Sequence, residues 1–111
     1  MKNISSAALF LTIFKASITY NIQEEILKGN LTLHEVINFN ENNEVYIHDY
    51  TFRQLVKSYA IQLIEEFSQC KCNEIERYIE KMNIEKMKEL FNYNSILDVA
   101  KKRFMRLQGL N

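Results

Sequence analysis

The chain has 111 residues, of which 47% are apolar and 25% are charged, and its formal net charge at pH 7 is zero. This length suits one domain with one core, and the composition is too apolar for a disordered chain. The sequence contains no Pro and only two Gly, which argues against β-sandwiches and glycine-rich phosphate-binding loops, since both need these residues at their turns. It therefore predicts a single all-α domain over residues 1–111.

The first predicted helix extends from Ser5 to Lys28 and ends at Gly29, where the chain can leave the helix without a steric penalty. Its apolar residues form two stripes at helical spacing on nearly opposite sides. The first stripe consists of Leu11, Phe14, Ile18, Ile22 and Ile26, and the second of Leu9, Ile13, Ala16 and Tyr20. A helix that is apolar on two sides is either central to the fold or shared with a partner.

The beginning of this helix also loosely resembles a signal peptide, because Lys2 precedes an apolar run from Ile4 to Phe14. However, Lys15 follows the run at once, and no small-residue cleavage site is present. The run is also too short to span a membrane. We therefore expect a cytoplasmic protein that has no membrane partner.

The region between the first helix and residue 50 has two interpretations. The favoured interpretation is a short helix from Thr32 to Asn38, followed by a polar turn over residues 39–44 and an extended segment from Val45 to Ile47. The alternative is a β-hairpin, in which His34–Phe39 pairs with Glu44–Asp49 across the Asn-rich turn.

Four further helices are predicted, at Phe52–Ser68, Glu74–Met82, Ile84–Phe91 and Ser95–Gln108. The apolar phase slips at Asn83, which predicts a bend and a helix cap there, and Gly109 is the expected C-cap of the last helix. Capping-box spacing predicts four other helix starts, at Thr32/Glu35, Thr51/Gln54, Asn73/Glu76 and Ser95/Asp98. We expect an irregular bundle of five to six helices around Ser5–Lys28 and Phe52–Ser68, with a short hairpin near residues 34–49 as the alternative.

The residues that could carry chemistry are few and scattered. Cys70, Cys72, His34 and His48 could supply four zinc ligands, but their spacing matches no common zinc module. Two cysteines one residue apart rarely form a good disulfide, so a reducing compartment is expected. No nucleophile or oxyanion loop accompanies the neighbouring pair His48–Asp49. The sequence therefore predicts no catalytic residue, metal or cofactor, no enzyme activity and no small-molecule substrate.

Charge is unevenly distributed along the chain. Residues 24–80 carry a net charge of −6, whereas residues 81–106 carry +4. The candidates for contact with nucleic acid or an acidic partner are Lys86, Lys88, Lys101, Lys102, Arg103 and Arg106. The alternative is that these cations stabilise helix C-termini and pair with the acidic first half of the chain.

These observations favour a protein that acts by contact rather than by chemistry. We expect a small subunit or inhibitor within a larger assembly, which either contains nucleic acid or consists of protein alone. In that assembly the chain binds a protein partner or a second copy of itself. The candidate protein interface consists of Leu9, Ile13, Tyr20, Glu24, Glu25, Glu41 and Glu44. Asn, Lys and Ile make up 35 of the 111 residues, as AT-rich codons produce, which indicates a low-GC bacterium or its phage. The alternative function is a nucleic-acid-binding accessory protein that uses the basic last helix.

Overall fold

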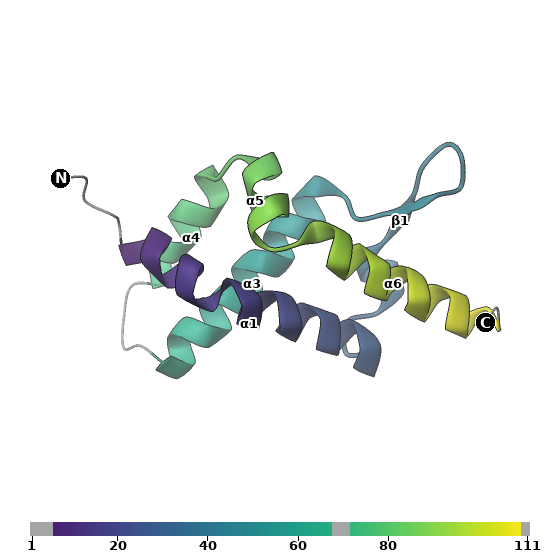
Figure 1. Cartoon of the computed structure of the whole chain (residues 1–111), viewed down its shortest axis with the longest axis horizontal. Helices are drawn as coiled ribbons and strands as arrows, with labels where there is room; N and C mark the ends of the chain where they lie inside the picture. The colour runs from purple at the N-terminus through teal and green to yellow at the C-terminus, as the bar shows by residue number, and fades with distance from the viewer. Residues whose placement is uncertain (1–5, 68–71, 110–111) are drawn as a thin grey trace.

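The computed structural model describes residues 6–67 and 72–109 and confirms a helical bundle with one tiny antiparallel hairpin (Figure 1). In chain order the elements are α1 (Ser6–Lys28), α2 (Leu33–Val36), β1 (Asn38–Phe39), β2 (Val45–Tyr46), α3 (Asp49–Phe67), α4 (Cys72–Lys81), α5 (Ile84–Leu90) and α6 (Tyr93–Leu107).

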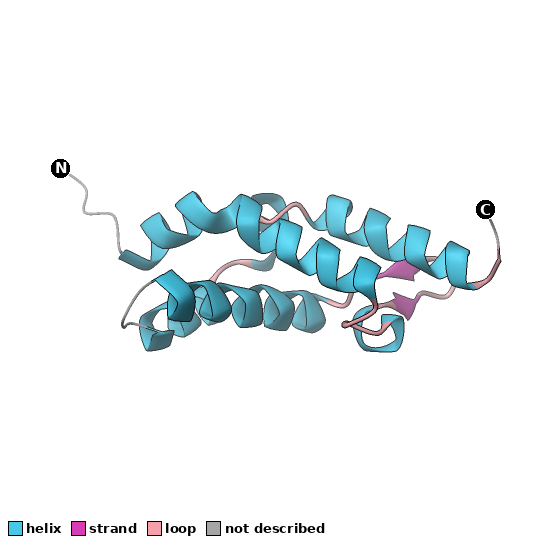
Figure 2. Cartoon of the chain, turned by 90° about the horizontal axis from the view of Figure 1, so that it is seen from below, coloured by secondary structure: helices cyan, strands magenta, loops and turns pink. Residues whose placement is uncertain are grey.

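The helices form two layers. One layer contains α1 and α6, which lie side by side, and the other contains α3 and α4, as Figure 2 shows from below. The hairpin packs against α6 at the end of the molecule where the chain terminates. Because α6 extends beyond the end of α1, the molecule is elongated, with principal extents of 52 × 28 × 19 Å.

The predicted central helices form most of the core. The first stripe of α1 is buried at Leu11, Ile18, Ile22 and Ile26, and it packs on the apolar face of α3. The core face of α3 consists of Phe52, Val56, Tyr59, Ala60, Leu63 and Ile64. Tyr59 is nearly buried, and this burial together with the charge of Glu25 raises the pKa of its hydroxyl.

Two polar side chains of α3, Arg53 and Lys57, reach α4. One guanidinium nitrogen, Nη1 of Arg53, donates to the carbonyl oxygens of Ile79 and Met82, each at 2.7 Å, and to that of Glu80 at 3.3 Å. Lys57 Nζ lies 3.0 Å from Oε1 of Glu80. Arg53 therefore caps the C-terminus of α4, where a positive charge is favourable.

Three of the four capping boxes were wrong as markers of helix starts, and the one at Thr32 was right. Thr51, Asn73 and Ser95 lie inside α3, α4 and α6, and Thr32 stands at the N-cap position of α2 without a side-chain cap bond. Asn83, which has no box, is a true cap, because its side chain accepts from the backbone N–H groups of Glu85 and Lys86. The bend predicted at this residue is confirmed.

Residues outside the predicted capping boxes cap the starts of α3 and α6. His48 precedes α3, and its Nδ1 accepts from the N–H of Tyr50 at 3.1 Å. Asn92 precedes α6 in the left-handed conformation, with φ 54°, and its side chain accepts from the N–H of Ser95. Both predicted glycine stops are confirmed, since Gly29 and Gly109 follow α1 and α6 with φ of 81° and 74°.

Both interpretations of residues 32–49 are partly right. The helix is limited to α2, and Asn38, predicted as its last residue, lies instead in β1 and pairs with Tyr46. The hairpin alternative is correct for two residues on each side of the turn. The ring of Phe39 packs edge-on against Phe104 of α6, with 5.4 Å between centroids, which attaches the hairpin to the bundle.

Tyr93 fixes the chain between β2 and α3. Its hydroxyl accepts from the N–H of Ile47 at 2.9 Å and donates to the carbonyl of the same residue at 3.1 Å. Its ring lies edge-on to Phe52, with centroids 5.2 Å apart. One side chain thus satisfies both backbone polar groups of a buried residue.

Candidate functional site

The second apolar stripe of α1 is uncovered. Leu9 is 51% exposed, Ile13 63% and Tyr20 60%, and Ala16 between them is also exposed. We call these four residues the exposed stripe. Each helical residue adds about 100° around the axis, so residues 9, 13, 16 and 20 share one side of α1, opposite the buried Ile18 and Ile22.

A polar hollow of about 380 Å³ lies beside the exposed stripe, between α1 and the junction of α5 with α6. Ala16 and Tyr20 line it from the stripe. Two of the residues that line it form hydrogen bonds across it: the Thr19 hydroxyl donates to the carbonyl of Phe91 at 2.9 Å, and Gln23 Nε2 donates to Ser95 Oγ. These bonds attach α1 to the start of α6, so the stripe is carried by a firmly packed helix.

The acidic interface candidates are divided between two places. Glu24 follows the stripe on α1, and its hydrogen bond with Tyr20 raises the pKa of the tyrosine hydroxyl. Glu25 accepts from Asn30 Nδ2 at 2.6 Å.

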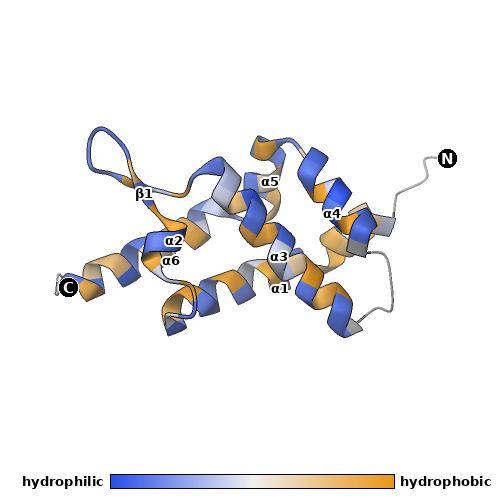
Figure 3. Cartoon of the chain, turned by 180° about the vertical axis from the view of Figure 1, so that it is seen from behind, coloured by the Kyte–Doolittle hydropathy of each residue, from blue (hydrophilic) through white to orange (hydrophobic). Residues whose placement is uncertain are grey.

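Glu41 and Glu44 lie in the hairpin loop, which is hydrophilic along its arc (Figure 3). Asn40 stabilises this loop, since its Oδ1 accepts from the N–H groups of Asn42 and Glu44, each at 2.9 Å. The loop and the N-terminal half of α1 lie at opposite ends of the molecule (Figure 1). The predicted protein interface is therefore two surfaces, and Leu9, Ile13 and Tyr20 form one of them.

The basic candidates are likewise not one patch. Lys88 Nζ lies 2.8 Å from Oδ1 of Asp49 and 5.0 Å from the ring centroid of Tyr93. The hydrogen bond to Asp49 raises the pKa of Lys88, although partial burial acts in the opposite direction. Arg103 donates to the carbonyl of Leu27 at 3.2 Å and thereby caps α1. Both side chains hold elements of the fold together.

The other basic candidates are exposed. Lys101 and Arg106 lie on the outer side of α6, and Lys102 pairs loosely with Asp98 at 3.5 Å, where both side chains are well exposed. Such a pair contributes little to stability. Lys86 lies on α5, which is separated from the C-terminal end of α6 along the long axis of the molecule (Figure 1).

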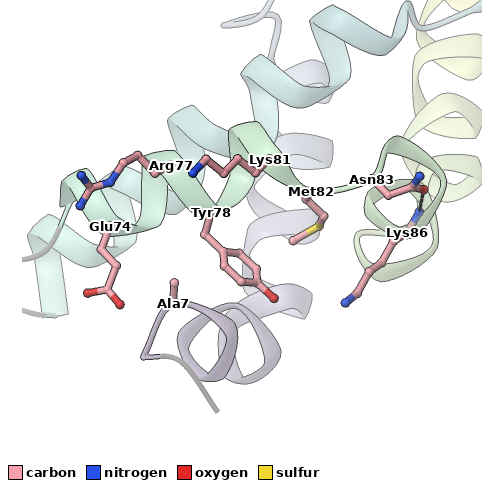
Figure 4. Close-up of a pocket in the computed structure, with 8 residues that line it drawn as sticks. All are labelled: Ala7, Glu74, Arg77, Tyr78, Lys81, Met82, Asn83 and Lys86. Atoms are coloured by element: carbon pink, nitrogen blue, oxygen red, sulfur yellow. Dashed lines mark hydrogen bonds between the residues drawn. The ribbon is translucent and has the colours of Figure 1, made fainter. Parts of the chain in front are cut away.

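Lys86 borders a hollow of about 540 Å³ between the start of α1, α4 and α5 (Figure 4). We call it the α4–α5 hollow. It is lined by Ala7, Arg77, Tyr78, Lys81, Met82 and Lys86, with Glu74 and Asn83 at its edges. The sequence did not reveal this site, because its residues come from three segments that only the tertiary fold brings together. The one signal was the spacing of Arg77 and Lys81, which places two cations on one side of a helix.

The candidate metal ligands do not meet among the described residues. Cys70 lies outside them, Cys72 begins α4, His34 lies in α2, and His48 caps α3. Within residues 6–67 and 72–109, no group of three or more His, Cys, Asp or Glu side chains could hold a metal ion. In the same ranges, no helix is long and apolar enough to cross a bilayer.

No protein-family model, curated protein or solved structure matches the chain.

Proposed function

We propose that this protein acts by binding another protein through the exposed stripe of α1, as a small subunit or inhibitor of a larger cytoplasmic assembly in a low-GC bacterium or its phage. The observation that carries the proposal is the exposure of Leu9, Ile13 and Tyr20, each more than half accessible on one side of one helix. Large apolar side chains gathered in this way are typical of interaction surfaces.

The stripe has the geometry of a helix-packing seam. Its spacing of four, three and four residues is that of a coiled-coil a/d seam, and Ala16 at its centre permits close approach of a second helix. Burying the exposed part of each large side chain contributes about 1 kcal/mol or more to binding. The neighbouring polar hollow, lined by Gln23 and Asn92, offers hydrogen-bonding groups at the rim of such an interface.

A pair of charge-introducing variants tests the proposal. Ile13→Asp places a carboxylate in the stripe, and Met105→Asp places one on α6 at a residue that is also half exposed (47%) but lies outside the stripe. Both variants should fold with a normal melting temperature, because neither residue belongs to the core. In a tagged pull-down from a low-GC bacterial lysate, Ile13→Asp should lose a stoichiometric protein band that Met105→Asp retains. Equal capture by both variants would contradict the proposal.

A nucleic-acid-binding role remains the second candidate, because Lys101, Lys102 and Arg106 are exposed at the end of α6. Its test leaves Arg103 intact, since that side chain holds α1. If these three residues contact phosphates, their replacement by Gln should weaken oligonucleotide binding and make it less sensitive to salt. Unchanged affinity in the triple variant would exclude this role.

A further inference from the structure

The α4–α5 hollow has an apolar floor and a cationic rim. Ala7 and Met82 are buried, and Tyr78 is half-buried between them. Its volume of about 540 Å³ is within the range typical of small-molecule sites, roughly 300–1,000 Å³. Arg77, Lys81 and Lys86 surround this floor and outweigh the single carboxylate of Glu74.

Two hydrogen-bond donors converge on the hollow from different helices. Figure 4 shows the hydroxyl of Tyr78 and the ammonium group of Lys86 directed into it, from α4 and α5 respectively, with Glu74 near the other end. Arg77 and Lys81 lie along the upper rim in this view. An anion placed between Tyr78 and Lys86 would therefore meet two donors.

The cationic side chains of the hollow do not stabilise the described part of the fold through ion pairs or hydrogen bonds. Lys57, Lys88 and Lys102 each form an ion pair. In contrast, the side chains of Arg77, Lys81 and Lys86 form no ion pair or hydrogen bond with any described residue. The lining of the hollow therefore carries a net positive charge, which favours an anionic ligand.

The walls of the hollow are fixed by side chains outside it or at its edge. Arg53 binds the carbonyl of Ile79, near the end of α4, and that of Met82, which follows the helix. Asn83 accepts from the N–H groups of Glu85 and Lys86 and so fixes the first turn of α5, which carries the Lys86 side chain. The backbone segments that carry the two donors are thus held in place before any ligand arrives.

We propose that the α4–α5 hollow binds an organic phosphate of mononucleotide size. The phosphate lies between Tyr78 and Lys86, and a flat ring packs on the floor formed by Tyr78 and Met82. Glu74, at the other end, accepts a hydrogen bond from an N–H group of that ring. This site is independent of the exposed stripe, and it departs from the expectation that no small molecule is recognised.

The test is a titration of the ¹⁵N-labelled full chain with adenosine 5′-monophosphate, followed by amide shifts in NMR spectra. Adenosine and inorganic phosphate serve as half-ligands. We expect saturable shifts at Tyr78, Met82 and Lys86, with weaker binding of each half-ligand because each fills only part of the site. Lys86→Gln should raise Kd at least about tenfold, since it removes a charge-assisted hydrogen bond. The matched control, Lys101→Gln on α6, should leave Kd unchanged.

The variants also separate binding from folding. Lys86 is exposed and its side chain has no described partner, so Lys86→Gln should melt like the wild type. Tyr78→Phe keeps the ring and removes only the second donor, so it should weaken nucleotide binding severalfold. An absence of saturable shifts, or equal weakening by Lys86→Gln and Lys101→Gln, would overturn the proposal. Much tighter binding of oligothymidylate, with shifts extending to α6, would replace it with a single-strand binding surface.

Discussion

The hydroxyl of Tyr93 offers a one-atom test of how the hairpin is held on the bundle. In Tyr93→Phe the ring remains against Phe52, whereas the N–H and C=O of Ile47 both lose their hydrogen-bond partner. Each net hydrogen bond contributes about 1 kcal/mol, and leaving a buried group unpaired costs more. We therefore expect a loss of about 2 kcal/mol in the free energy of unfolding.

This loss is large enough to measure. For a domain of this size it corresponds to a fall in melting temperature of about 8 °C. Urea unfolding followed by circular dichroism would give the free energy directly. Tyr50→Phe is the matched control, because Tyr50 is 66% exposed and should change stability by less than about 0.5 kcal/mol. If the Tyr93→Phe and Tyr50→Phe variants unfold at the same urea concentration, Tyr93 does not hold this segment.

Three other changes should alter stability in ways that the structure specifies. Gly29→Ala should lower the free energy of unfolding, measured in urea, by about 1–2 kcal/mol, because φ is 81° and the new Cβ would lie 3.1 Å from Nη2 of Arg103. An unchanged midpoint would show that the turn relaxes freely. Arg53→Met should cost about 2–3 kcal/mol by the same assay, since the carbonyls at the end of α4 lose a charged donor, and a neutral result would mean that water replaces it. The raised pKa of Tyr59 means that the folded state keeps this proton to higher pH than the unfolded chain, so stability should fall as the pH rises above about 10. Tyr59→Phe should flatten that fall between pH 9 and 11, and an equally steep fall in the variant would assign it to other groups.

Hydrophobic periodicity was sufficient to predict the helices, because a buried stripe demands apolar residues at helical spacing. It separated α4 from α5 at Asn83 and identified the stripe of α1 that is buried in the structure. It also identified the second stripe, which is likewise apolar. Periodicity alone could not decide which of the two stripes faces the core, since that depends on where α3 and α6 pack.

Local capping patterns predicted most helix starts poorly, because the backbone conformation between two helices determines which residue caps the second. The left-handed conformation of Asn92 lets α6 begin at Tyr93, so the box at Ser95 falls inside the first turn. His48 caps α3 in the same way, ahead of the box at Thr51. A side chain can cap the start of a helix only at the residue where the backbone enters the helix. Residue spacing in the sequence does not specify that position.

The charge pattern along the sequence did not predict which cationic side chains share a surface. Arg103 and Lys88 were predicted as contact residues, yet each is used to join two parts of the fold. Conversely, Arg77 and Lys81 were left out, although they border the same hollow as Lys86. A run of cations in sequence becomes a surface only after packing decides which of them meet backbone carbonyls or carboxylates.

The central claim, that the exposed stripe of α1 is a binding surface, is tested most directly by photocrosslinking in cells of a low-GC bacterium. A benzophenone amino acid would replace Ile13 in one variant and Met105 in the other, two residues of similar exposure on different helices. We predict one discrete, higher-mass adduct from position 13 and none from position 105. No adduct at position 13, or the same adducts at both positions, would contradict the claim.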